Sequence, residues 1–158
     1  MFEKILVCLD GSELAEQILP YATEQALRFG SRVVLLEVVR PSTTYVTPGV
    51  PGTSPGMAVF TDADVDQALR EWEESKAYLD RVARRLRRRK LRVSPVTLTG
   101  PTGPAIVAYA QENGVDLIAL ATHGRSGVGR LVLGSVADYV VRKSNLPILI
   151  TRPQYKAG

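Results

Sequence analysis

Short apolar runs alternate with amphipathic helical patterns along almost the whole of this 158-residue chain, and no other feature limits the fold as strongly. The first run is almost continuously apolar, which is typical of a strand covered on both faces. The runs of this kind are residues 4–9, 32–39, 91–99, 115–120 and 146–151. Strand–helix alternation predicts parallel strands joined by right-handed crossovers. We therefore expect a single α/β domain with an open, parallel, five-stranded sheet and helices on both faces.

The helical patterns between these runs carry apolar residues at three- and four-residue spacing. They cover residues 14–27, 62–89, 104–110 and 136–141. Pro20 lies in the first of them and predicts a kink or a broken first turn. Residues 41–61 hold four prolines and three glycines without periodicity, which predicts a flexible loop. The domain is expected to span residues 1–153, with residues 154–158 as a C-terminal tail.

The composition is that of an ordinary globular protein, with 45% hydrophobic and 23% charged residues. No apolar run approaches the roughly 20 residues of a membrane span, and the N-terminus does not resemble a signal peptide. The single cysteine, Cys8, lies in an expected buried strand, where cysteine packs as a small hydrophobe. One cysteine cannot form an intramolecular disulfide, which agrees with a reducing compartment. These features predict a cytoplasmic protein without a membrane partner.

The net charge of +4 is concentrated in the basic run 84–90. Such a run can contact nucleic acid or an anionic membrane. It is more often the solvated end of a helix, where the negative end of the helix dipole favours basic side chains. We adopt the second interpretation and expect no nucleic-acid partner.

A glycine-rich, basic segment, residues 121–130, joins the fourth apolar run to the last helical pattern. Four glycines fall within residues 124–134, more than a plain connection needs. Glycine lets backbone N–H groups approach an anion, and a helix N-terminus adds unpaired donors with partial positive charge. The segment therefore predicts a site for nucleotide phosphates. The chain has neither a GxGxxG nor a GxxxxGK motif, so a dinucleotide enzyme or a P-loop NTPase is not expected.

Two other segments are expected to meet this turn, because ligands of open parallel sheets bind at the carboxyl ends of the strands. Asp10 and Ser12 follow the first expected strand, and Val38 lies near the end of the second. Asp10 or Ser12 can also serve only as the N-cap of the first helix. The segments together predict one site.

Several residues of the segment have a structural as well as a functional interpretation. Ser135 begins a capping-box pattern with Asp138, so its hydroxyl can serve the helix, a phosphate, or both. His123, the only histidine, fits core packing or donation to a phosphate oxygen, and one histidine alone does not make a zinc site. Arg125 and Arg130 suit phosphate charge or simple solvation.

The chain resembles the universal stress protein family over almost its whole length. The resemblance is carried by residues 4–12, Gly100, and residues 116–118, 122–127, 133–136 and 145–149. The ATP-binding branch of that family has the signature Gly, two residues, Gly, nine residues, then Gly-Ser or Gly-Thr. Gly124 and Gly134-Ser135 match this signature, whereas Ala121 replaces the first glycine. Its methyl group would leave less room for the phosphates that the resemblance implies.

The resemblance implies a Rossmann-like fold of the adenine nucleotide alpha hydrolase type that binds ATP. Asp10 and the backbone near Cys8 would then contact the ribose and adenine, and the backbone of Val38 would read the adenine edge. Ser135 and the N–H groups that follow it would hold the terminal phosphates. The other residues of the implied nucleotide site are Gly100, Ala121, Thr122, His123, Gly124, Arg125, Ser126, Gly127, Gly134, Val136 and Ala137. Similar proteins bind Mg²⁺ or Mn²⁺ with the nucleotide, and many form homodimers, for which we expect strand 146–151 to be the contact.

Three functions remain open at this point: an ATP-binding regulatory module of the stress response, a slow ATPase or other adenosine-nucleotide hydrolase, and a dimeric interaction protein without nucleotide. An efficient hydrolase needs a held metal and a residue that orients water. The acidic candidates around the turn are Asp10, Glu37, Asp116 and Asp138, with no obvious pair. The sequence therefore favours the regulatory module, acting on an unidentified protein partner.

Overall fold

The computed structural model describes residues 1–40, 62–122 and 133–154. Its elements in chain order are β1 (Lys4–Leu9), α1 (Glu13–Glu16), α2 (Leu19–Phe29), β2 (Arg32–Val39), α3 (Asp62–Arg87), β3 (Arg92–Thr99), α4 (Thr102–Glu112), β4 (Leu117–Ala121), α5 (Ser135–Lys143) and β5 (Ile148–Thr151). The predicted alternation of strands and helices is confirmed. The predicted loop 41–61 lies outside the described residues.

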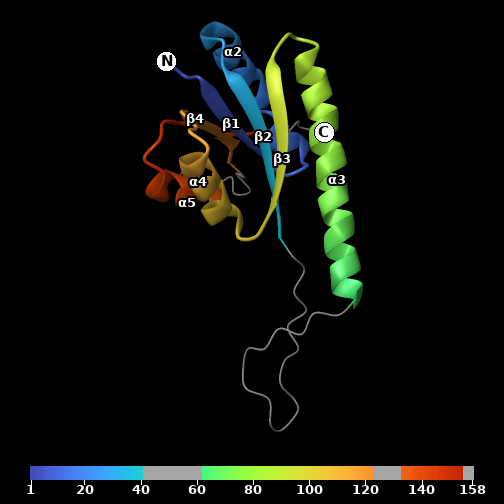
Figure 1. The fold of residues 1–158 in the computed structure, drawn as a ribbon. Coiled ribbons are helices and arrows are strands. Elements are labelled where there is room, and N and C mark those ends of the chain that lie inside the picture. The colour runs from blue at the N-terminus through green and yellow to red at the C-terminus, as the bar shows by residue number, and fades with distance from the viewer. Residues whose placement is uncertain (41–61, 123–132, 155–158) are drawn as a thin grey trace.

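The five strands form one parallel sheet in the order β3-β2-β1-β4-β5 (Figure 1). β1 is central, with Val7 in register with Leu35 of β2 on one side and Ala119 of β4 on the other. The chain adds β2 and β3 on one side of β1, and β4 and β5 on the other. The direction of winding therefore reverses between β1 and β4, which is where open α/β sheets bind ligands.

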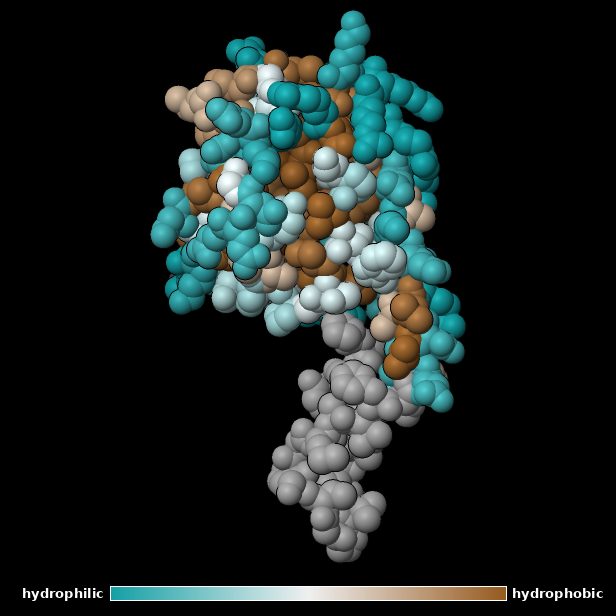
Figure 2. Space-filling model, in the orientation of Figure 1, coloured by the Kyte–Doolittle hydropathy of each residue, from teal (hydrophilic) through white to brown (hydrophobic). Residues whose placement is uncertain are grey.

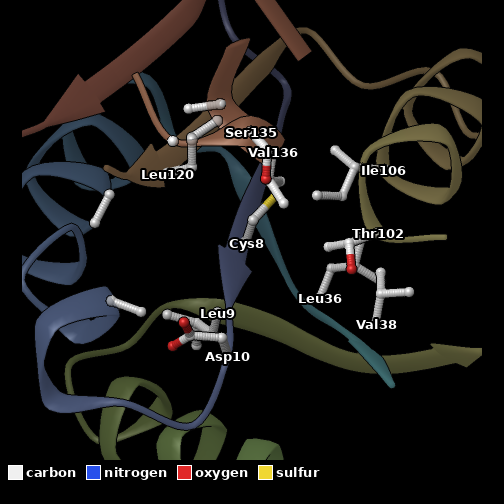
Figure 3. Close-up of a pocket in the computed structure, with 14 residues that line it drawn as sticks. Cys8, Leu9, Asp10, Leu36, Val38, Thr102, Ile106, Leu120, Ser135 and Val136 are labelled. Carbon is white, nitrogen blue, oxygen red and sulfur yellow. The ribbon is translucent and has the colours of Figure 1, made fainter. Parts of the chain in front are cut away.

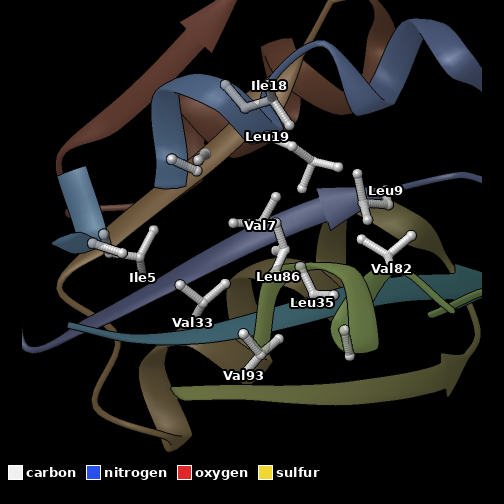
Figure 4. Close-up of a cluster of buried hydrophobic side chains, with 14 of the residues drawn as sticks. Ile5, Val7, Leu9, Ile18, Leu19, Val33, Leu35, Val82, Leu86 and Val93 are labelled. Atoms are coloured by element: carbon white, nitrogen blue, oxygen red, sulfur yellow. The ribbon is translucent and has the colours of Figure 1, made fainter. Parts of the chain in front are cut away.

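Successive residues of β1 pack into two separate hydrophobic cores, because side chains alternate between the two faces of a sheet. Ile5, Val7 and Leu9 pack under α1, α2 and α3, and this first core is drawn in Figure 4. Leu6 packs on the opposite face with Ile106 of α4 and with α5. Both faces of the sheet are thus covered, which explains why the β1 sequence is apolar at nearly every position.

The first predicted helix is divided in two at the position where Pro20 predicts a break. α1 ends at Glu16, and α2 begins at Leu19 with Pro20 in its first turn, where a missing N–H costs nothing. Ser12 is the N-cap of α1, since its Oγ accepts a hydrogen bond from the Ala15 N–H at 3.1 Å. The N-cap is therefore Ser12 and not Asp10.

Other element boundaries differ from prediction by a few residues. α4 begins at Thr102, two residues before the predicted start. Pro104 is tolerated in its first turn, because the N–H groups of a first turn have no partner within the helix. β5 begins at Ile148 instead of residue 146, although the Pro147 carbonyl still accepts from the Ile118 N–H at 3.1 Å. Of the predicted tail, Gln154 is described, and it exchanges two hydrogen bonds with Gln17.

The basic run forms the end of α3 and the residues just after it. Arg85 pairs with Glu16 at 2.5 Å, and Arg87 donates to the Val93 carbonyl at 2.7 Å. The N-terminal part of α3 extends past the sheet (Figure 1), and hydrophobic atoms are visible on the surface there (Figure 2). Val65 and Leu69 of this part are exposed. No helix in the described part of the chain is long and apolar enough to cross a bilayer.

Candidate functional site

A cavity of about 210 Å³ lies at the carboxyl ends of β1, β2 and β4, beside the start of α5 (Figure 3). Its lining residues come from six segments of the chain: Cys8, Leu9, Asp10, Ala15, Leu36, Val38, Thr102, Ile106, Leu120, Ala121, Gly134, Ser135, Val136 and Ala137. The cavity coincides with the reversal of strand order. The structure thus brings together the ends of β1, β2 and β4 and the start of α5.

The walls of the cavity are mainly apolar. Leu36, Ile106 and Leu120 are buried there at 1%, 2% and 4% exposure, and each belongs to the second core. The site residues predicted from the sequence did not include Leu36, Ile106 or Leu120, nor Thr102, which also lines the cavity. Leu36 could have been found because it precedes Val38 by two and so shares its face of β2, and Thr102 and Ile106 because they are four apart on one helix. Apolar walls with a few polar groups are typical of sites for small organic ligands.

Asp10 is fixed at the mouth of the cavity by the turn that follows β1. Its Oδ1 accepts hydrogen bonds from the backbone N–H of Ser12 at 3.0 Å and from the Ser12 Oγ at 2.6 Å. The same Ser12 hydroxyl caps α1. This chain of bonds orients an exposed carboxylate, which is an acceptor for ligand hydroxyl groups.

Glu37 lies beside Asp10, but it faces the opposite side of the sheet. Its Oε2 accepts a hydrogen bond from Ser75 Oγ of α3 at 2.7 Å, and it lines a separate hollow with Gly11 and Tyr78. Removal from water raises the pKa of the Glu37 carboxyl; the Ser75 bond lowers it, and the negative charge of Asp10 raises it further. The charge of Asp10 therefore acts on the Glu37 carboxyl at the carboxyl end of the sheet.

The other two acids predicted around the turn, Asp116 and Asp138, do not line the cavity. Asp116 lies at the amino end of β4, where its Oδ2 accepts from the Glu3 and Lys4 N–H groups at 2.9 Å each. Asp138 of α5 pairs with Arg142 at 2.9 Å. Within residues 1–40, 62–122 and 133–154, no cluster of His, Cys, Asp or Glu side chains could hold a metal ion by itself.

Cys8 contributes its side chain to the cavity wall (Figure 3). Burial raises the pKa of the Cys8 thiol to about 12, because the thiolate would lose its hydration. The thiol is therefore protonated at neutral pH. This state agrees with the interpretation of Cys8 as a small packing residue.

The start of α5 differs from the predicted capping box. Gly134 is the N-cap residue and has no side chain to offer, while Ser135 is already the first helical residue and is exposed. The capping-box interpretation of Ser135 and Asp138 is therefore wrong, since the box requires Ser135 one position earlier. Neither Gly134 nor Ser135 provides a side-chain cap for the first N–H groups of α5. These N–H groups form the positive end of the helix dipole and lie beside the cavity.

The remaining predicted residues are placed as follows. Thr122 is buried, and its N–H donates to the Thr151 carbonyl at 2.9 Å, so it joins β4 to β5 without lining the cavity. Gly100 adopts a φ of +133° at the turn before α4 and lines an adjoining hollow. The residues outside the described part of the chain are His123, Gly124, Arg125, Ser126, Gly127 and Arg130.

The structure defines a Rossmann-like α/β fold of the doubly wound class, with a cavity at the switch point of its sheet. The model of the universal stress protein family matches residues 1–152, and the chain belongs to this family. It is 28% identical to universal stress protein MJ0577 of Methanocaldococcus jannaschii over 158 residues, which cover 96% of each protein.

Solved structures show the same fold. The structure of MJ0577 superposes with a TM-score of 0.75 at 24% identity, covering 99% of both chains. A universal stress protein solved in complex with cAMP gives a TM-score of 0.68 at 19% identity, covering 97% of this chain and 98% of that one. The universal stress protein from Archaeoglobus fulgidus in complex with dAMP gives a TM-score of 0.62 at 22% identity, covering 94% of this chain and 97% of that one.

Proposed function

We propose that this chain is an ATP-binding regulatory module of the stress response with slow or no intrinsic hydrolysis. The observation that carries the proposal is that Asp10, Val38 and Ser135, from three separate elements, line one cavity at the switch point of the sheet. Structural relatives solved with cAMP and with dAMP support an adenine nucleotide as the ligand class. A cytoplasmic location and a protein partner that responds to the nucleotide are part of the proposal.

The backbone of β2 suits recognition of the adenine edge. β1 pairs with β2 only as far as Leu9 and Glu37, whereas β3 pairs with β2 to Val39. Val38 therefore has no β1 residue beside it. Its backbone can meet the polar edge of a base, while the apolar walls of the cavity cover the faces of the ring.

The sugar and the phosphates fit the polar rim. The Asp10 carboxylate is positioned to accept from a ribose hydroxyl, and the first N–H groups of α5 at Ser135 and Val136 are positioned to donate to phosphate oxygens. Mg²⁺ or Mn²⁺ is proposed to arrive with the nucleotide, because phosphate oxygens supply ligands that the described side chains do not.

Titration calorimetry of the purified protein with ATP and magnesium tests this function. We expect saturable binding with one nucleotide per chain, and phosphate release well below about 1 per second, the lower range of dedicated enzymes. Faster release would instead support the ATPase interpretation. Absence of binding, together with no nucleotide in a mass spectrum of the gently purified protein, would support the nucleotide-free interaction protein.

We also propose that the chain forms a homodimer through β5. Among residues 1–40, 62–122 and 133–154, β4 is the only strand that pairs with β5, which lies at the edge of the sheet, and an open edge attracts a second strand. A two-fold axis lets two such edges pair with each other and closes the assembly.

Light scattering at tens of micromolar is expected to give a dimer mass for the native protein and a larger monomer fraction for Ile150→Lys. The control is Val141→Lys, at a half-exposed position of α5 outside the strand. A native monomer would contradict the homodimer. A dimer that resists both Ile150→Lys and Ile148→Lys would place the contact elsewhere.

A further inference from the structure

A second hollow adjoins the nucleotide cavity where α4 and α5 begin. It is lined by Arg40, Gly100, Pro101, Thr102, Gly103, Pro104, Ser135, Val136 and Tyr139. Three of these residues, Thr102, Ser135 and Val136, also line the nucleotide cavity. A group bound at Ser135 therefore faces both hollows.

Arg40 brings a positive charge to this second hollow. It follows directly after β2, and its Nε donates a hydrogen bond to the Oγ1 of Thr102 at 3.2 Å. This contact holds an otherwise exposed side chain over the first turn of α4. An arginine carries five N–H donors, and the Thr102 contact engages one of them.

The surroundings of Arg40 favour an anion. None of the described residues that line the second hollow is acidic. The helices α4 and α5 both begin there, and their N-cap residues, Pro101 and Gly134, supply no side-chain acceptor for the first N–H groups. Two helix N-termini and a guanidinium group thus surround one space beside Ser135, and their charges act in the same direction.

We propose that Arg40 is a specificity-determining residue that binds the outer phosphates of the nucleotide, so that the chain prefers ATP to AMP and cAMP. The inference rests on the proposed function. If phosphates bind at Ser135, those farther from the ribose can extend into the second hollow toward Arg40. A nucleotide with one phosphate has no group to place there. The guanidinium fork matches phosphate oxygens in geometry as well as in charge.

Calorimetry with ATP, AMP and cAMP on the native protein and on Arg40→Ala tests the inference. We expect Arg40→Ala to weaken ATP binding about tenfold and to change AMP and cAMP binding by less than about twofold. Arg40→Lys is expected to be intermediate, because lysine keeps the charge but loses the fork. Thr102→Val should weaken ATP binding less than Arg40→Ala does, because it removes only the hydroxyl that positions Arg40.

The matched control is Arg28→Ala on α2, an exposed arginine paired with Glu24, for which all three affinities should stay unchanged. Equal losses for ATP and AMP in Arg40→Ala, or no loss for either, would overturn the assignment of Arg40 while leaving nucleotide binding intact. If the native protein binds none of the three nucleotides, the proposed function fails, and the role of Arg40 fails with it.

Discussion

Ser135→Glu is expected to weaken ATP binding about a hundredfold, close to 2.7 kcal/mol, while leaving the fold intact. Ser135 is exposed at the first position of α5 and lines the cavity. A carboxylate there would occupy the space proposed for a phosphate group and would repel the phosphate charge. The same carboxylate favours the helix, since a negative charge at a helix N-terminus contributes about 0.3–1 kcal/mol of stability. Affinity and stability should therefore change in opposite directions.

Calorimetry with ATP and thermal unfolding, measured on the same preparations, test this separation. The control is Ser135→Ala, which removes one hydroxyl without adding charge and should weaken binding by no more than about tenfold. Unchanged ATP affinity in Ser135→Glu would show that phosphates do not bind at α5. A marked loss of stability would show instead that Ser135 is a structural residue.

Gly103→Ala is expected to cost about 3 kcal/mol of folding free energy, although alanine ordinarily suits a helix better than glycine. A Cβ at this position would lie 2.8 Å from Cδ1 and 2.9 Å from Cγ of Tyr139, on α5. The Tyr139 Cβ, which is fixed to the backbone of α5, would also lie only 3.0 Å away, so rotation of the tyrosine side chain does not relieve the whole contact. Gly103 is therefore the point at which α4 and α5 approach each other.

The tyrosine partner provides the test. In the double variant Gly103→Ala/Tyr139→Ala the added methyl group has room, so urea unfolding should show a coupling free energy of about 1 kcal/mol or more between the two sites. Additive losses would mean that the close approach does not determine the cost. Because Ser135 and Thr102 begin these two helices, Gly103→Ala should also weaken ATP binding.

The fold was predictable because its pattern is repeated along the chain, whereas several details of the site depend on position to within one residue. The continuous apolar run of β1 and the helical spacing after it were enough to predict a parallel sheet covered on both faces. The role of Ser135 was not predictable in the same way. An N-cap residue and a first helical residue differ by one position, and helix boundaries predicted from a sequence are no more precise than that.

Tertiary contacts account for the other differences. Asp116 was counted among the acidic candidates around the turn, but it comes before β4 and therefore lies at the amino end of the sheet. Arg40 was missed because it stands alone after an apolar run. Its relation to Thr102, 62 positions away, arises only when the two segments meet in the fold.

The sheet separates α4 and α5, which line the cavity, from α2 and α3, which do not. Of the helical residues at the cavity, Ala15 of α1 is on one side, and all the others belong to α4 or α5. Substitutions on α2 and α3 can therefore accumulate without altering a single cavity contact. Related chains are free to carry different outward surfaces on those helices, and so to address different partners, while keeping the same cavity lining.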